Sequence, residues 1–202
     1  MHKVFITYHH ENDQYSKEKI LRLNDRHSIF IDKSVHTGDI SDDLGDQAIR
    51  RIIRDDYLSD STVTILLVGT ETKGRKHVDW EVYSSMFDGT VNTKSGILVI
   101  NLPSTGCDLC TAAHNEHEQV YPEIPHWNWI TVDTEAGYKH RYPFMPDRII
   151  DNLLAPKARI SVVPWSKATN PNHLRFLIEA TFAHRQHCSY DLSRRMRRRN
   201  SP

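Results

Sequence analysis

The sequence predicts an α/β fold: a three-layer sandwich around a mostly parallel central sheet, followed by a C-terminal helical extension. Two observations lead to this prediction. Four strand-like segments alternate with three helical segments within roughly the first hundred residues, and strands separated by helices of this length form parallel βαβ units. The two longest apolar runs, 64–68 and 97–102, are short and nearly continuous, as expected of strands buried on both faces of a parallel sheet.

The predicted elements of the first half follow the chain in order. β-branched and aromatic residues mark the strands, and apolar residues at helical spacing mark the helices. Ser41 suits the N-cap position of the second helix, after a loop that contains Gly38. The elements are a strand at 3–8, a helix at 11–25, a strand at 28–32, a helix at 41–54, a strand at 62–68, a helix at 78–87 and a strand at 96–102.

The second half carries weaker patterns. Residues 104–126 are polar and rich in His and Pro, which indicates a long loop or an irregular insertion. We expect one domain over 1–155, then a C-terminal extension over 156–202 with one strand, one helix and a basic tail. The predicted elements are a fifth strand at 129–133, a helix at 147–154, an extra strand at 160–163 and a helix at 172–186.

Composition limits the location and the partners. No apolar run approaches the roughly 20 residues of a membrane helix, no signal-like stretch begins the chain, and the three cysteines suit a reducing compartment. We therefore expect a cytoplasmic protein without a membrane partner. Five of the 26 Lys and Arg residues lie at 194–199, leaving 21 basic against 26 acidic residues elsewhere. This acidic body disfavours nucleic acid as a partner.

The basic tail itself has two interpretations. The simpler one is a solvated, disordered end of the chain, because termini are usually loose. The alternative is a segment that grips nucleic acid or the acidic face of a partner.

Polar side chains follow three predicted strands at the edge where ligands bind open parallel sheets, which is the carboxyl edge. Tyr8 is better placed there than Phe5, because the two alternate along the first strand. The second-strand group could contact phosphate or ribose, or supply ordinary turn polarity. The candidate residues are Tyr8, His9 and His10 after the first strand, Asp32, Lys33 and Ser34 after the second, and His77, Trp80 and Glu81 beyond the third.

Three segments carry a family resemblance. KVFITYHH at 3–10 resembles the first strand of TIR domains, and SIFIDKS at 28–34 with its Gly-containing loop resembles their second strand and BB loop. STVTILLVGTETKGRKHVDWEVYSSM at 61–86 resembles the TIR-like ThsB family of the Thoeris anti-phage defence system. In that family a strand ending in Val/Ile-Gly-Thr/Ser precedes a basic stretch and then Trp-Glu or Tyr-Glu. The resemblance covers roughly 1–103 and implies a flavodoxin-like fold.

The resemblance implies cleavage of NAD⁺, with Glu81 as the catalytic residue. A carboxylate beside the ribose can stabilise the oxocarbenium-like charge that grows as nicotinamide leaves. Without the resemblance, Glu81 would be interpreted as a solvent-facing acid in the first turns of a helix. Many NAD-cleaving TIR domains carry a Trp four residues before the glutamate; here that position is His77, and Trp80 directly precedes Glu81. Because of this departure, the resemblance assigns no stacking partner to nicotinamide.

The function implied by the resemblance is that of an anti-phage sensor. NAD⁺ is then the substrate, with no separate cofactor, and the product is an ADP-ribose-derived nucleotide, either a cyclic isomer or a conjugate. This diffusible nucleotide activates a partner effector, and a phage-derived molecule is the trigger. The resemblance does not decide between a monomer and a homo-oligomer. The alternative is a non-catalytic interaction module that assembles through its helices and BB loop. A response regulator or nucleotide binder is disfavoured, because Tyr8, His9 and His10 replace an acidic cluster or a Gly-rich loop.

A second group of side chains lies in the predicted insertion. Cys107, Cys110, His114 and His117 are four potential zinc ligands within eleven positions. Zinc fingers usually leave a longer excursion between their ligand pairs, so metal binding is only a weak alternative here. A Cys-x-x-Cys redox pair is a further alternative. The favoured interpretation is a reduced loop without metal.

Overall fold

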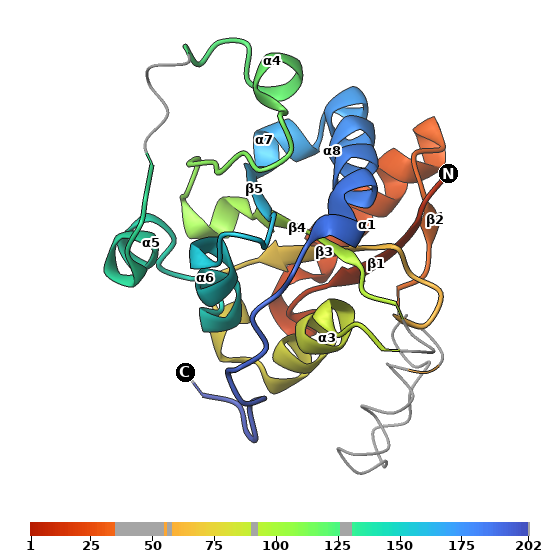
Figure 1. The fold of residues 1–202 in the computed structure, drawn as a ribbon. Coiled ribbons are helices and arrows are strands. Elements are labelled where there is room, and N and C mark those ends of the chain that lie inside the picture. Colours follow the sequence, from red (N-terminus) through yellow and green to blue (C-terminus); the bar gives the residue numbers. More distant parts are fainter. Residues whose placement is uncertain (35–54, 56–57, 90–92, 126–130, 202) are drawn as a thin grey trace.

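The computed structural model describes residues 1–34, 55, 58–89, 93–125 and 131–201 (Figure 1). Within these residues, five strands form one parallel sheet in the order β2-β1-β3-β4-β5. This is the flavodoxin-like strand order, in which the chain reverses direction across the sheet between β1 and β3. The predicted fold class is therefore confirmed. The strands are β1 (Lys3–Thr7), β2 (Ile31–Asp32), β3 (Val63–Val68), β4 (Gly96–Asn101) and β5 (Ser161–Pro164).

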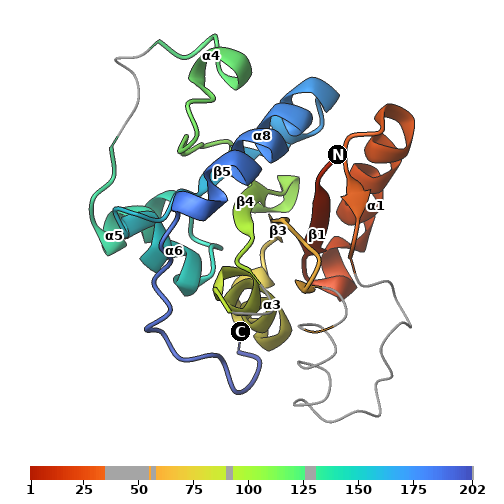
Figure 2. The ribbon, with the colours of Figure 1, turned by 45° about the vertical axis from the view of Figure 1, so that its right-hand side comes forward.

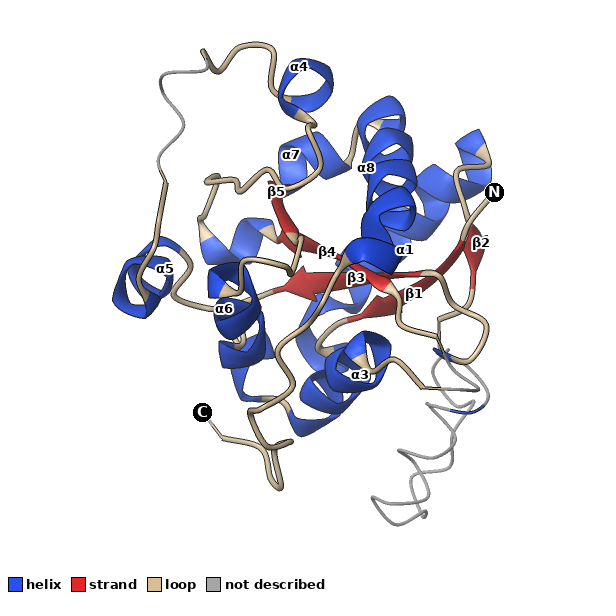
Figure 3. Cartoon of the chain, viewed as in Figure 1, coloured by secondary structure: helices blue, strands red, loops and turns tan. Residues whose placement is uncertain are grey.

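Helices cover both faces of this sheet (Figures 1 and 3). α1 and α8 lie on one face, and α3 and α6 lie on the other. Successive residues of a strand point to opposite faces, so Ile65 joins the cluster under α1 and α8 while Leu66 joins the cluster under α3 and α6. The described helices are α1 (His10–His27), α3 (Lys76–Met86), α4 (His117–Val120), α5 (Glu135–Arg141), α6 (Asp147–Leu154), α7 (Trp165–Ala168) and α8 (Pro171–His184).

The first four predicted strands and the helices at 11–25, 78–87, 147–154 and 172–186 are confirmed, with ends that shift by a few residues. The second strand is shorter than predicted, because only Ile31 and Asp32 pair with β1. The predicted helix at 41–54, with its Ser41 N-cap and the preceding Gly38 loop, lies outside the described residues.

The predicted fifth strand at 129–133 is wrong in its described part. Residues 131–133 form no strand, and Thr131 and Asp133 are exposed, which does not suit a sheet covered by helices on both faces. β5 instead comes from the segment predicted as an extra strand, where Val162 and Val163 are fully buried and Val162 pairs with Val99 of β4. The chain beyond residue 155 thus supplies the fifth strand of the same sheet.

The basic tail is ordered, so the interpretation of residues 194–199 as a disordered end is wrong. Backbone groups of Arg194 and Arg197 are hydrogen-bonded to side chains of α6 and α3. None of the helices in the described part of the chain combines the length and the apolar character that crossing a bilayer requires.

Candidate active site

Glu81 lies in the molecular interior, against the end of β1. It projects from the second turn of α3 and is 5% exposed, and the Thr7 hydroxyl at the last position of β1 donates a hydrogen bond to Glu81 Oε2. The alternative of a solvent-facing acid is therefore wrong. Since β1 and β3 flank the point where the sheet reverses its strand order, Glu81 lies where ligands of such sheets bind.

The environment of Glu81 favours its protonated form. Burial raises the pKa of Glu81 from its usual 4.5 to about 7, while the hydrogen bond from Thr7 and the positive charge of Lys17 lower it in part. Lys17 reaches this region from α1 and is 1% exposed, with its ammonium 5.2 Å from the centre of the Tyr8 ring. A carboxyl group with a pKa near neutrality is a frequent property of catalytic acids.

Replacing Lys17 with methionine is expected to raise the pKa of Glu81 further, because the variant keeps most of the buried volume but removes the cation that favours the carboxylate. A ¹³C NMR titration of the Glu81 carboxyl carbon measures this change. Lys19→Met is the matched control, since Lys19 is exposed and its ammonium lies over the Tyr15 ring. An unchanged Glu81 pKa in the Lys17 variant would show that the two charges do not interact.

Two predicted residues at the end of β1 form a stacked pair near Glu81. The ring of Tyr8 lies 4.4 Å from that of His10, with an interplanar angle of 11°, and the Tyr8 hydroxyl donates to Gln14 Oε1. Burial raises the pKa of Tyr8 to about 12, and the negative charge of Glu81 adds to the rise. The pKa of His10 is lowered, first by desolvation of its ring and then by Lys17 and His77. The structure thus places these side chains close together: Tyr8 interacts electrostatically with Glu81, and His10 interacts with Lys17 and His77.

His9 has different surroundings from His10. It is the N-cap residue of α1, its carbonyl accepts the Asp13 N–H at 2.9 Å, and the residue is buried. The Nε2 atom lies 3.7 Å from Glu11 Oε2, and the buried Nδ1 atom has no hydrogen-bond partner among the described residues.

The predicted second-strand group is occupied by contacts within the protein. Ser34 accepts the Ile6 N–H at 3.0 Å and donates its own N–H and O–H to Asp32 Oδ1. The Lys33 ammonium lies 3.3 Å from the Asp60 carboxylate. Because β2 pairs with only the first part of β1, these residues lie beside β1 and not beyond its carboxyl end. Their contacts agree with the alternative of turn polarity.

Trp80 and His77 share the first turns of α3 but have different surroundings. Trp80 is 6% exposed, and its indole N–H donates to the Arg197 carbonyl at 2.8 Å, so its polar edge is occupied by the tail. His77 is half-buried and meets the Trp80 ring edge-on at 5.0 Å. Residues four apart share a helix face, so His77 lies on the same side of α3 as Glu81.

Sequence reasoning missed Thr7 and Lys17. A signal for Lys17 was present, because Asp13, Lys17, Ile20 and Asn24 recur at helical spacing and form the buried side of α1. Charged residues on the face that packs against a sheet are rare unless they are paired. The hydroxyl of Thr7 carried no such signal, since threonine is common in strands.

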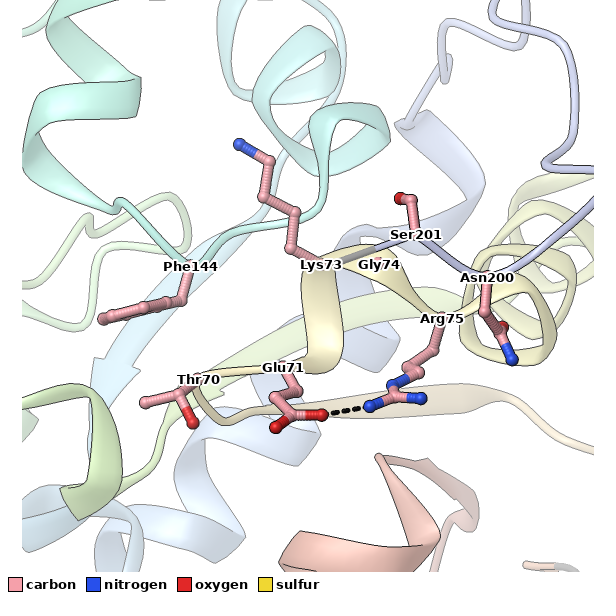
Figure 4. Close-up of a pocket in the computed structure, with 8 residues that line it drawn as sticks. All are labelled: Thr70, Glu71, Lys73, Gly74, Arg75, Phe144, Asn200 and Ser201. Carbon is pink, nitrogen blue, oxygen red and sulfur yellow. Dashed lines mark hydrogen bonds and ion pairs between the residues drawn. The ribbon is translucent and has the colours of Figure 1, made fainter.

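A cavity that Glu81 does not line lies beyond the carboxyl end of β3, at the start of α3 (Figure 4). Its volume of about 650 Å³ falls in the range of small-molecule sites. Glu71 and Arg75, two of its lining residues, form an ion pair with each other (Figure 4). It is lined by Thr70, Glu71, Lys73, Gly74, Arg75, Phe144, Asn200 and Ser201.

The structure does not bring the four potential zinc ligands together. Cys107 donates to the Arg141 carbonyl at 3.5 Å, whereas His114 stacks on His184 with 3.2 Å between their Nδ1 atoms. Burial raises the pKa of the Cys110 thiol, which opposes the thiolate form that metals and redox chemistry need. In the described part of the chain, which includes Cys107, Cys110, His114 and His117, no three His, Cys, Asp or Glu side chains are placed to hold a metal ion.

Fold and site together define the class of protein: a flavodoxin-like α/β domain of the TIR-like type, with a buried acid of α3 at the β1–β3 switch point. A family model described as Thoeris protein ThsB, TIR-like domain, matches residues 5–106. The chain belongs to this family, and is thus a TIR-like protein associated with Thoeris defence. The matched residues run from β1 through β4 and include both Thr7 and Glu81. No curated protein matches the chain.

Proposed function

We propose that this protein cleaves NAD⁺ at the bond between nicotinamide and ribose and converts the remainder into an ADP-ribose-derived signalling nucleotide that activates a partner effector. The observation that carries this proposal is the burial of Glu81 against Thr7 at the β1–β3 switch point. The same residue is the glutamate of the Trp-Glu motif on which the family resemblance rests.

The proposed reaction requires one negative charge beside the ribose. The glycosidic bond breaks with its electron pair going to nicotinamide, which leaves as a neutral molecule, and C1′ of the ribose becomes oxocarbenium-like. The Glu81 carboxylate stabilises this positive charge, and its effect is strong because water is excluded from its surroundings. Water or a substrate hydroxyl then attacks C1′. With a pKa of about 7, Glu81 can also accept the proton that this nucleophile loses.

The residues around Glu81 suit the remaining contacts. As whole residues, His10 is exposed and His77 is half-buried, so both lie at the surface beside Glu81, where a substrate can meet them. Tyr8 is 1% exposed, and its ring stacks on the ring of His10 and supports it. We assign His10 and His77 to nicotinamide or ribose binding, with NAD⁺ as substrate and without a separate cofactor.

Replacing Glu81 with glutamine tests the proposal. The amide keeps the shape and still accepts the Thr7 hydroxyl hydrogen bond, but it cannot stabilise an oxocarbenium ion by charge. Release of nicotinamide is expected to fall on the order of a hundredfold or more, measured by chromatography on purified protein and by mass spectrometry of nucleotides in phage-infected cells. Glu118→Gln is the matched control, since Glu118 is exposed on α4.

The infected-cell measurement covers an enzyme that is silent until a phage-derived trigger is present. Equal nucleotide levels in cells with the unchanged protein and in cells with Glu81→Gln, at equal protein abundance, would refute the proposal. Protection from phage that persists without any nucleotide would favour a non-catalytic interaction module.

A further inference from the structure

The C-terminal strap, which we define as residues 194–201, returns to the domain and lies beside α3 (Figure 2). Most of its side chains are exposed, including those of Arg195, Arg198 and Arg199. The strap nevertheless has a fixed place, because its main chain is hydrogen-bonded to the protein at several points. Two of its arginines also make ion pairs with α6: the Arg194 guanidinium binds both carboxylate oxygens of Asp151, and Arg197 lies 3.9 Å from Asp147. Backbone hydrogen bonds and these ion pairs dock the strap together.

Three hydrogen bonds join the strap to the first turns of α3. Asn200 Oδ1 accepts the Lys76 N–H at 2.9 Å, the Arg197 N–H donates to Asp79 Oδ2 at 2.8 Å, and the Trp80 indole donates to the Arg197 carbonyl at 2.8 Å. The first N–H groups of a helix need acceptors from outside it. The N-cap residue Arg75 makes no capping hydrogen bond with its side chain, so Asn200 takes over this task from more than a hundred positions away.

Arg148 of α6 ties the same two segments together. Its side chain is fully buried, and its guanidinium binds both carboxylate oxygens of Asp79, at 2.8 and 3.1 Å. The remaining N–H groups donate to the carbonyls of Arg194 at 2.9 Å and Arg195 at 3.4 Å. Helix α3 is thus held by Thr7 through Glu81 on one side, and by the strap and Arg148 through Asp79 and Trp80 on the other.

We infer that the C-terminal strap is a positioning element for Glu81: by fixing the first turns of α3, it sets the place of the Glu81 carboxylate relative to Thr7 and the substrate. This inference rests on the proposed function. Asp79, Trp80 and Glu81 are consecutive residues, so a displacement of the two anchored residues moves Glu81 with them. A misplacement of about 1 Å in a reacting group can cost roughly a hundredfold in rate.

Two strap substitutions test the inference on the full chain. Asn200→Ala removes the acceptor at Lys76, and Arg197→Pro removes the N–H that Asp79 accepts. Each is expected to lower kcat for nicotinamide release by roughly tenfold or more with a smaller change in KM. Asn200→Asp restores an acceptor at the helix N-terminus and is expected to restore kcat. Arg198→Ala removes an exposed charge and is expected to leave kcat unchanged.

A titration separates positioning from a loss of folded protein. Loosening α3 admits water to Glu81, so its carboxyl ¹³C titration should move toward lower pH in Asn200→Ala and return in Asn200→Asp. This readout needs no turnover. Wild-type kcat and an unmoved titration in both Asn200→Ala and Arg197→Pro would overturn the inference. The inference would also be overturned if kcat fell only in proportion to the fraction of folded protein while the Glu81 titration stayed unchanged.

The proposed function fails by a different result. It fails if Glu81→Gln produces as much nucleotide as the unchanged protein, whatever the strap variants do. The titration of Glu81 in the strap variants then still decides whether the strap fixes α3.

Discussion

Replacing Arg148 with methionine is expected to lower the free energy of unfolding by about 3–5 kcal/mol, because it leaves the buried Asp79 carboxylate without its cation. Arg148 is fully buried and Asp79 is 7% exposed at the side chain, so neither charge is well solvated in the folded protein. The variant also removes the donors to the Arg194 and Arg195 carbonyls. Urea unfolding at neutral pH measures the change, with the slope of the transition checking two-state behaviour.

Two further variants test this explanation. Arg22→Met breaks an exposed pair with Glu18, 3.6 Å apart on α1, and should cost less than about 0.5 kcal/mol. Asp79→Asn combined with Arg148→Met removes the unpaired buried carboxylate but keeps an acceptor for the Arg197 N–H. This double variant should recover much of the lost free energy of unfolding. A cost in Arg148→Met no larger than in Arg22→Met would mean that the pair is solvated in solution.

Replacing Glu81 with glutamine is expected to stabilise the protein at pH 8. The folded pKa of Glu81, about 7, lies above its usual value of 4.5, so the folded state binds this proton more tightly than the unfolded state. The contribution is therefore fully present below pH 4.5, and it is lost as the pH rises toward 7. Glutamine never ionises and avoids that loss, which amounts to on the order of 2–3 kcal/mol above pH 7.

Unfolding curves at pH 5 and pH 8 measure this effect. The gain in Glu81→Gln should be large at pH 8 and small at pH 5, whereas the exposed Glu118→Gln control should show little difference between them. The same substitution is expected to remove nicotinamide release, so stability would rise as activity falls. Such opposition is typical of residues kept for function at the expense of stability. An identical gain at both pH values would contradict the raised pKa.

The fold was predictable where the sequence periodicity was local. The apolar runs of β3 and β4 and the spacing of apolar residues in α8 predict these elements directly, because each residue faces a packed layer. β5 was predicted as an extra strand, and its place in the sheet was not, because Val162 pairs with Val99 across more than sixty positions. Nothing in a local pattern indicates which of two short apolar segments completes a sheet.

In the candidate site, too, local sequence features were predictable and contacts between distant segments were not. Glu81 was found through its motif, and the end of β1 through the rule that ligands bind at the carboxyl edge. The hydrogen bond from Thr7, the approach of Lys17 and the role of Asn200 are contacts between distant segments, which no spacing along the chain encodes. For the same reason, the composition of the arginine-rich segment predicts a loose tail, whereas backbone hydrogen bonds to α3 and α6 and the ion pair of Arg194 with Asp151 hold it in place.

The long separation between α3 and the strap has a consequence for synthesis on the ribosome. Trp80 and its partner Arg197 are 117 positions apart, and at about 5–20 residues per second the ribosome needs roughly 6–24 s to make the intervening chain. Arg148, the counter-ion of Asp79, is made within this interval because it follows Asp79 by 69 positions, whereas Arg197 and Asn200 come only at its end. The contacts between the strap and α3 therefore form only after the segment from Trp80 to Arg197 has been made, and a nascent chain without the strap carries Glu81 on a helix whose first turns lack these anchors.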